Sequence, residues 1–308
     1  MKYSVIIIVD HKYSDTEQFI QGMYDLFSGF SIPFEILIVA NGFAEWLGAG
    51  FQEELFKRPE AKYIEFKTKT SQSVCLKAGI KESRGEIVVV CDSYQQITNA
   101  SLIDLLDNLD NDISIVTPYR QNRVDSLLNQ IESRIFNWII SKMVSTNSHD
   151  MSCTVKVFRR EVLEQVKFYG NLYRFLPILA EERGYKTREV RCDHYQQRGS
   201  SGIYSLPYYL KVLIDIVTLY FNVKFSRKPL RFFCAVGLLF ILTGFFMVSI
   251  IFMQKFLQGY PIGDRPSLLI SMLLIVMGIQ AASIGLLGEI IAFTHGRHRK
   301  QYSIEKVI

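Results

Sequence analysis

This 308-residue sequence lacks paired cysteines, which argues against a zinc site and against a disulfide framework. The five cysteines are odd in number, and no two stand in the C-x-x-C spacing typical of zinc sites. Their wide spacing also argues against a disulfide framework. We therefore expect free, buried thiols at Cys75, Cys91, Cys153, Cys192 and Cys234.

Charged residues are absent from two long stretches near the C-terminus, residues 232–253 and 267–288. These stretches contribute to the hydrophobic share of 49% and the mean hydropathy of +0.14. A helix of about 20 apolar residues crosses the hydrocarbon core of a bilayer, and both stretches are long enough. Buried core helices of a soluble fold are the alternative, but such helices normally carry a polar stripe. We predict two transmembrane helices.

Basic residues flank the two stretches on one side. They precede the first stretch at 224–231 and follow the second at 295–300, whereas the charged residues of 254–266 are only Lys255, Asp264 and Arg265. Because lysine and arginine favour the cytoplasmic side, we expect a multi-pass protein whose soluble domain and both termini are cytoplasmic. The net charge of +5 then suits anionic headgroups. No basic face interleaved with aromatic residues is present, so we expect no nucleic-acid partner.

Apolar runs alternate with amphipathic segments over the first 120 residues. Fully apolar strands separated by helices are typical of a mostly parallel sheet that is covered on both faces. We expect strands at residues 3–9, 34–40, 62–66, 86–91 and 113–117, and helices at 15–27, 71–83 and 101–109.

The pattern is more mixed after residue 120. Residues 124–143 form an amphipathic stretch, a strand is expected at 155–158, and a helix should start at Arg160. Residues 185–193 are a second mixed segment. Residues 206–220 are amphipathic and aromatic, which is typical of a helix lying in the headgroup plane.

Polar residues directly follow three of the predicted strands. Asp10 follows the first, Asn41 the second, and Asp92 the fourth, with Tyr94 close behind. Ligands of open α/β sheets bind outside the carboxyl ends of the strands. We therefore expect these four side chains to contribute to a binding site.

Five segments in this order carry a family resemblance: KAGIKESRGEIVVVCDS, VKVFRREVLEQV, NLYRFLPILAEERGYKTREV, FSRKPLRFF and LGEIIAF. The chain resembles the family-2 glycosyltransferases of the polyprenyl-phosphate type, related to dolichol-phosphate mannose synthase and bactoprenol glucosyltransferases. The resemblance implies an α/β GT-A (Rossmann-like) domain with a mostly parallel sheet at 1–203. Juxtamembrane amphipathic helices would follow at 204–231, and a transmembrane hairpin with a cytoplasmic tail at 232–308.

The activity that this resemblance implies is transfer of a sugar from a nucleotide sugar to a polyprenyl phosphate, undecaprenyl or dolichyl, at the cytoplasmic membrane face. The outcome would be inversion, by direct attack of the phosphate oxygen on the anomeric carbon. The departing diphosphate develops negative charge, which requires Mg²⁺ or Mn²⁺ or cationic side chains nearby. Chains could also associate through the transmembrane helices.

The sequence departs from the family at its acidic motifs. The Asp-x-Asp metal motif falls on residues 92–94, where Asp92 is retained but Tyr94 replaces the second carboxylate. The acidic pair after the second strand is Ala40 and Asn41 here. A single carboxylate should still bind a divalent ion together with substrate phosphates, though more weakly.

Other family positions are retained. Asp150 matches an aspartate that contacts the sugar or orients the acceptor. Arg120 and Arg198 match arginines expected to reach phosphate, and an arginine fork suits that ligand. Lys156 lies on the strand after Asp150 and is a candidate substrate contact.

Each candidate also has a structural interpretation. Asp92 could cap the following helix, and Asp150 could cap the amides of residues 154 and 155. Arg120 and Arg198 could form surface ion pairs. Lys156 could simply point outward from its strand. Tyr94 could fill the space of the lost carboxylate or stack on a ligand.

Two other functions remain open at this stage. A catalytically weakened homologue could bind nucleotide sugar or lipid phosphate in a scaffolding role, which the replacements at residues 40, 41 and 94 favour. A transporter subunit is the other, but the two uncharged spans provide no polar pathway.

Overall fold

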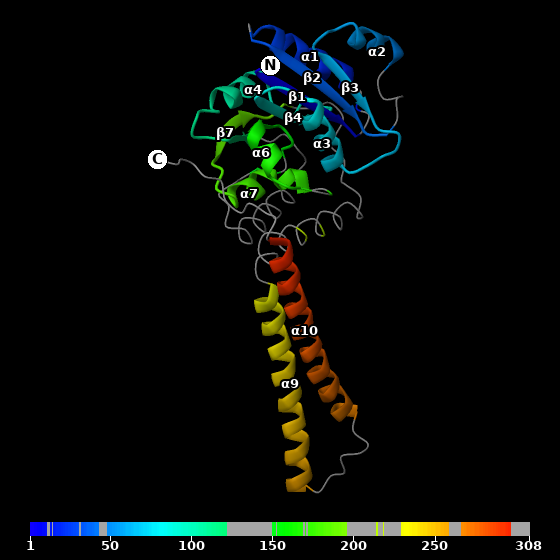
Figure 1. Cartoon of the computed structure of the whole chain (residues 1–308), viewed down its shortest axis with the longest axis vertical. Helices are drawn as coiled ribbons and strands as arrows, with labels where there is room; N and C mark the ends of the chain where they lie inside the picture. Colours follow the sequence, from blue (N-terminus) through cyan, green and yellow to red (C-terminus); the bar gives the residue numbers. More distant parts are fainter. Residues whose placement is uncertain are drawn as a thin grey trace. The chain divides into compact units, whose positions relative to one another are not determined.

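The computed structural model describes residues 1–10, 13, 15–30, 32–42, 48–121, 150–151, 153–168, 170, 172–195, 214, 218, 229–258 and 266–296. The chain divides into two compact units, an α/β unit and a helical hairpin (Figure 1). Each unit is described by itself below.

The α/β unit is built on one seven-stranded sheet with the order β3-β2-β1-β4-β6-β5-β7. Neighbouring strands are parallel except at β6, which runs antiparallel to both β4 and β5. This confirms the predicted mostly parallel α/β fold. The strands are β1 (Tyr3–Val9), β2 (Phe34–Ala40), β3 (Ala61–Glu65), β4 (Ile87–Asp92), β5 (Ile115–Gln121), β6 (Lys156–Arg159) and β7 (Thr187–Asp193).

The six predicted strands agree with β1 to β6, with the same limits for β1 and β2 and differences of a few residues at the ends of the others. β7 lies in the segment 185–193, which was described only as mixed. The helices α1, α3, α4 and α6 were also predicted. The sequence patterns did not predict α2, η2 or α7, which are short. The helices are α1 (Thr16–Ser28), α2 (Ala49–Phe56), α3 (Gln72–Glu82), α4 (Asn99–Asp107), α6 (Arg160–Gln165), the 3₁₀ helix η2 (Leu172–Phe175) and α7 (Leu176–Glu181).

Both faces of the central strands are buried. On one face, Val5 and Ile7 of β1 belong to the same core cluster as Ile20 and Phe27 of α1. Side chains alternate along a strand, so Ile6 points to the opposite face, where Gly79 of α3 packs against it. A Cβ on Gly79 would lie 2.7 Å from Ile6 Cγ2, so a larger residue would push α3 off the sheet. Burial of each such isoleucine stabilises the fold by roughly 1.5–3 kcal/mol.

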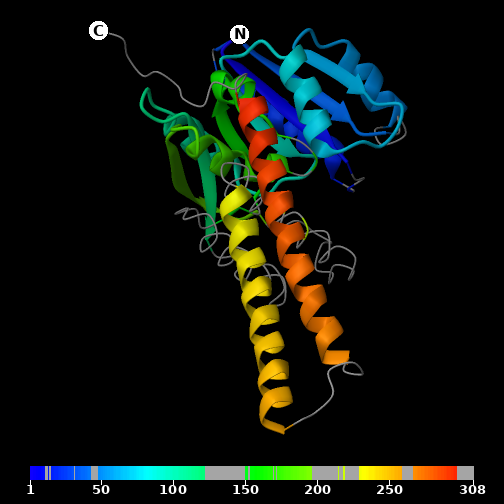
Figure 2. The same ribbon diagram turned by 60° about the horizontal axis from the view of Figure 1, so that its bottom comes forward.

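The second unit is a hairpin of two long helices, α9 (Pro229–Gln258) and α10 (Pro266–Gly296), which lie side by side in Figures 1 and 2. The helices approach closely at Gly237 and Gly278, where a Cβ on Gly237 would lie 2.6 Å from the Gly278 carbonyl oxygen. Both are long and apolar enough to cross a membrane. Only 17% of the most apolar part of each helix is buried, and Phe246 is 68% exposed. The alternative of two buried core helices is therefore wrong.

Some predictions fall outside the described residues. These are the amphipathic stretch at 124–143 and nearly all of the interfacial helix expected at 206–220. The domain boundaries at 203/204 and 231/232 remain predictions.

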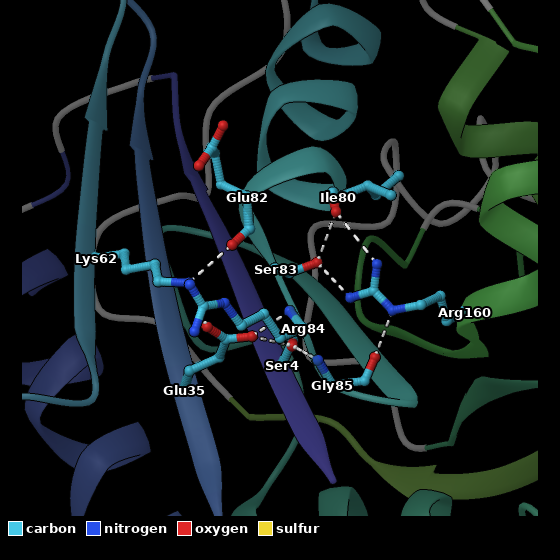
Figure 3. Close-up of polar contacts among 9 residues, drawn as sticks. All are labelled: Ser4, Glu35, Lys62, Ile80, Glu82, Ser83, Arg84, Gly85 and Arg160. Atoms are coloured by element: carbon cyan, nitrogen blue, oxygen red, sulfur yellow. Dashed lines mark hydrogen bonds and ion pairs between the residues drawn. The ribbon is translucent and has the colours of Figure 1, made fainter. Parts of the chain in front are cut away.

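A polar network ties the strands together at the edge opposite their carboxyl ends (Figure 3). Glu35 is 2% exposed and accepts hydrogen bonds from Ser4 Oγ (2.7 Å), Lys62 Nζ (2.8 Å) and the backbone amide of Arg84. Ser4 Oγ in turn accepts from the Gly85 amide at 2.7 Å. The carboxylate therefore joins β1, β2, β3 and the turn that leads into β4.

Arg160, the first residue of α6, extends this network to the C-terminal end of α3. Its Nε donates to the Gly85 carbonyl at 2.7 Å, and its guanidinium also donates to Ser83 Oγ (2.8 Å) and the Ile80 carbonyl (3.3 Å) (Figure 3). The end of α3 is thus held to the start of α6, although the residues lie far apart in sequence.

We predict that Glu35→Gln lowers the free energy of unfolding by about 2–3 kcal/mol at neutral pH, because charged hydrogen bonds are lost in a buried site. Burial raises the pKa of Glu35, but hydrogen bonds from Lys62, Ser4 and Arg84 and the Lys62 charge hold it below its ordinary 4.5 overall. The stabilisation is therefore present above that value and disappears as pH falls through the lowered pKa. Urea unfolding of the full-length protein in detergent at several pH values measures this difference. Exposed Glu53→Gln is the control, and equal losses in both variants would contradict the prediction.

Candidate active site

The sheet topology brings the predicted site residues to one edge. Asp10, Asn41 and Asp92 lie at or just after the carboxyl ends of β1, β2 and β4. Because β6 is antiparallel, its first residue lies beside the end of β4, where Lys156 pairs with Val90. Asp10, Asn41, Asp92 and Lys156 therefore lie at the same edge of the sheet, although they are far apart in sequence.

Asp92 is a partly buried carboxylate surrounded by charges. Burial raises its pKa to about 6, against the opposing effects of the Arg174 charge, a hydrogen bond from Thr154 and the Lys156 charge; Asp10 raises it further. Asp92 does not cap the next helix, because Thr98 does so by accepting a hydrogen bond from the Ser101 amide. The capping interpretation of Asp92 is therefore wrong.

Lys156 is buried, with 3% of its surface exposed. Its ammonium donates to the Cys153 carbonyl, and burial lowers its pKa to about 8. The interpretation of Lys156 as an outward-pointing residue is wrong, since β6 is covered on both faces. Residues 156–158 are all buried.

Tyr94 is tied into a neutral hydrogen-bond network. Its ring packs against the Tyr13 ring with centroids 4.7 Å apart, and its hydroxyl accepts from the Gln96 amide. The side-chain oxygen of Gln96 accepts hydrogen bonds from the backbone amide (2.8 Å) and the hydroxyl (3.0 Å) of Thr154. The residue at the second carboxylate position thus connects the loop after β4 to the segment that enters β6.

Asn41 positions a neighbouring loop. It is 1% exposed, its amide donates to Asp10 Oδ1 (2.8 Å) and the Thr70 carbonyl (2.9 Å), and its oxygen accepts from the Thr70 amide (2.7 Å). Lys69 forms an ion pair with Asp10 Oδ1 at 3.3 Å. Gly42 allows this close approach, because its φ is +72° and an added Cβ would lie 2.3 Å from the Lys69 nitrogen. Asp10 and Lys69 are the charged groups that this arrangement presents.

Arg120 and Asp150 form a buried ion pair. Arg120 Nε and one terminal nitrogen contact the two carboxylate oxygens at 2.7 Å and 3.1 Å, and the residues are 7% and 3% exposed. The Thr154 amide donates to Gln96, so the interpretation of Asp150 as a cap of that amide is wrong. The pair holds the end of β5 to the segment before β6.

Two charged residues at this edge were not predicted, Arg174 of η2 and Lys69. Arg174 lies inside the segment NLYRFLPILAEERGYKTREV that carries the family resemblance, which was the available signal. Lys69 has no such signal. Arg198, by contrast, lies outside the described residues.

The donor set limits how a metal could bind. In the ranges that the structure describes, no three histidine, cysteine, aspartate or glutamate side chains lie together as a metal cluster. Asp92 supplies one carboxylate, and a hard cation is commonly held by one or two carboxylates plus substrate phosphates. The residues therefore fit a divalent ion that Asp92 shares with a phosphate-bearing ligand.

Comparison with known proteins gives two family matches. Residues 4–167 match "Glycosyl transferase family 2", and residues 228–293 match the "GtrB C-terminal hairpin". The chain is 25% identical over 240 residues to the dodecaprenyl-phosphate galacturonate synthase of Rhizobium johnstonii, covering 77% of this chain and 71% of that one. It is 26% identical over 285 residues to the undecaprenyl-phosphate 4-deoxy-4-formamido-L-arabinose transferase of Yersinia enterocolitica, covering 90% and 84%.

Solved structures resemble the α/β fold. Glucosyl-3-phosphoglycerate synthase from Mycobacterium tuberculosis, in complex with Mn²⁺, UDP and phosphoglyceric acid, superposes with a TM-score of 0.55 at 11% identity. The match covers 72% of this chain and 78% of that chain. At this identity the likeness shows the fold.

We predict that Asp150→Leu lowers the free energy of unfolding by about 3–5 kcal/mol, because the buried Arg120 guanidinium loses the carboxylate that it contacts through two nitrogens. The double variant Arg120→Met/Asp150→Leu should recover most of this loss. Chemical denaturation of the full-length protein measures the cycle. The exposed pair Lys186–Asp112, at 2.6 Å, is the control, and Asp112→Leu should cost less than about 1 kcal/mol. A cost for Asp150→Leu no larger than this control would rule out a stabilising buried pair.

Proposed function

The chain belongs to glycosyl transferase family 2, and we propose that it transfers a sugar from a nucleotide sugar to a polyprenyl phosphate, with inversion. The observation that carries the acceptor class is the combination of two matches on one chain, the transferase domain and the C-terminal hairpin. Relatives that match over most of their length are named for transfer to dodecaprenyl or undecaprenyl phosphate. The phosphate of a lipid acceptor lies at the membrane surface, and α9 and α10 can provide an anchor there.

The donor would bind at the carboxyl ends of β1 and β4. Asp10 and Lys69 would orient the nucleoside, with Asn41 fixing the loop that carries Lys69. Asp92 would lie at the diphosphate, together with Mg²⁺ or Mn²⁺, which supplies positive charge there when bound. Solved structures of similar fold contain Mn²⁺ or Mg²⁺ with UDP.

The transfer itself is a single displacement. An oxygen of the lipid phosphate forms a bond to the anomeric carbon as the bond from that carbon to the donor diphosphate breaks. The electron pair leaves with the nucleoside diphosphate, so one bond forms and one breaks, and the configuration inverts. A phosphate monoester is already anionic at neutral pH, with a second pKa of about 6. Positioning and charge neutralisation are therefore the main tasks of the protein.

The acceptor phosphate would be received near Arg120, Asp150 and Arg198. Asp150 holds the Arg120 guanidinium in a fixed orientation, so it acts on the substrate as a positioning residue or through one of its own oxygens. Arg198 follows from the family resemblance. An arginine fork provides the paired donors that phosphate recognition requires.

A second candidate function is a binding homologue without effective turnover. The specific observation that favours it is Tyr94, which replaces a carboxylate and is held by Gln96 and Tyr13. Such a protein would bind the nucleotide sugar without forming glycosylated lipid.

We predict that the purified full-length protein forms glycosyl-lipid from undecaprenyl phosphate and one member of a panel of radiolabelled nucleotide sugars. Asp92→Asn should lower kcat about 100-fold, because charge on the departing diphosphate is less well compensated. Arg198→Ala should instead raise KM for the lipid about ten- to hundredfold. Asp107→Asn, an exposed aspartate at the end of α4, is the control. Nucleotide binding without transfer from any donor would favour the binding homologue.

We also propose that both termini face the cytoplasm and that residues 254–266 face outward. In intact cells, a membrane-impermeant thiol reagent should label Gly259→Cys in a background that lacks Cys234. A cysteine at Ser303 should be labelled only after permeabilisation. The reverse pattern would invert the topology.

A further inference from the structure

Gln280 is a polar side chain near the middle of the second hairpin helix. It is the one amide side chain in the two uncharged stretches, 232–253 and 267–288. The part of α10 that is apolar enough to cross a membrane runs from Pro266 to Ile291. At 1.5 Å per residue, Gln280 lies about 16 Å from the nearer end, which is beyond the reach of its side chain. When α10 spans a bilayer, Gln280 therefore lies in the hydrocarbon core.

Gln280 points away from α9. The side of α10 that packs against α9 carries Ser271, Gly278 and Gly285, at a spacing of seven residues, and Ser271 is fully buried. Cβ atoms added to Gly278 and Gly285 would lie 2.5 Å and 2.7 Å from side-chain atoms of α9. Gln280 follows Gly278 by two residues, which places it about 200° further around the helix, and it is exposed. The other helix of the hairpin is therefore on the wrong side to pair with it.

Hydroxyl groups of the hairpin are satisfied within their own helices, whereas the Gln280 amide is not. Thr243, Ser249 and Ser283 each donate to the backbone carbonyl four residues earlier, at 2.8 Å, 2.8 Å and 3.0 Å. Among the residues that the structure describes, the Gln280 side chain has no hydrogen-bond partner. An amide has two donor hydrogens and an acceptor oxygen, and leaving them unpaired in hydrocarbon is costly. Gln280 therefore calls for a partner outside its own hairpin.

A second copy of the chain carries a matching partner at the matching depth. Copies insert with one orientation, so their Gln280 side chains lie at the same level of the bilayer. Because an amide both donates and accepts, two of them can pair across a two-fold axis along the membrane normal. The neighbours of Gln280 on this side of the helix are apolar and between 49% and 60% exposed, so they can pack around the pair; they are Leu273, Val276, Ile284 and Leu287. The hydrocarbon tail of a lipid offers no hydrogen bond at this depth.

We propose that two copies of the chain pair in the membrane through the Gln280 face of α10, with hydrogen bonds between the two Gln280 amides at its centre. The Gln280 face consists of Leu273, Val276, Gln280, Ile284 and Leu287. Polar side chains join transmembrane helices in this way, each with a modest gain in affinity. The proposal gives the association expected from the sequence a specific surface, and it does not depend on which reaction the α/β unit catalyses.

The test is energy transfer between two fluorescently labelled populations of the full-length protein in phosphatidylcholine vesicles, diluted stepwise with lipid. Gln280→Leu should weaken pairing about 5- to 30-fold, because the amide hydrogen bonds are lost. Leucine is more apolar than glutamine, so this variant should insert in the membrane at least as well as the wild type. Gln280→Asn, which retains an amide, should keep most of the affinity.

Ser283→Ala is the matched control. Ser283 lies within one turn of Gln280 and is also exposed, but its hydroxyl is already bonded to the Ile279 carbonyl. Loss of that hydroxyl should leave pairing unchanged.

Cysteine crosslinking in native membranes identifies the face that is used. In a Cys234→Ala background, in which the other four cysteines are buried, Leu287→Cys should form a crosslinked dimer on oxidation with copper phenanthroline. Leu286→Cys should not, because Leu286 is equally accessible, at 53% exposed, but lies on another side of α10.

Three results would overturn the proposal. They are a wild type that stays monomeric at every lipid dilution, a Gln280→Leu variant that pairs as tightly as the wild type, and crosslinking through Leu286→Cys in place of Leu287→Cys. Association only after another membrane protein is added would likewise exclude a second copy as the partner. Formation of glycosyl-lipid is measured separately, so failure of this proposal and failure of the proposed function are distinguishable.

Discussion

Burial of both sheet faces is the constraint on which the rest of the α/β unit depends. Val5 and Ile7 are covered on one side and Ile6 on the other, so charged groups cannot lie along β1 without a large desolvation cost. They gather instead at the strand ends. The carboxyl ends carry the candidate active site, and the opposite ends carry the network centred on Glu35.

The reversed direction of β6 adds the residues that distinguish this site. A parallel strand in that position would place its first residue at the opposite edge, near the start of β4. Because β6 is antiparallel, Lys156 and the Thr154 backbone lie beside Asp92 and Gln96 instead. Asp92 and Lys156 thus reach this edge from strands that run in opposite directions.

Local sequence patterns predicted much of this arrangement. The β-branched runs of β1 and β2 have the observed limits, and the polar residues after β1, β2 and β4 do meet at one edge. The pairing of Arg120 with Asp150 could not be predicted, because it depends on how a segment 30 residues away returns to the sheet. The burial of Lys156 was missed for a related reason, since alternation along a strand does not indicate exposure when both faces are covered. Uncharged runs predicted the two long helices, but not the close contact at Gly237 and Gly278.

The central claim is that the donor diphosphate binds at Asp92, at the carboxyl end of β4. The most direct measurement is a structure of the full-length protein with its nucleoside diphosphate bound. We expect the diphosphate, or a divalent ion that it shares, to contact the Asp92 carboxylate. A diphosphate bound away from Asp92 would contradict the claim.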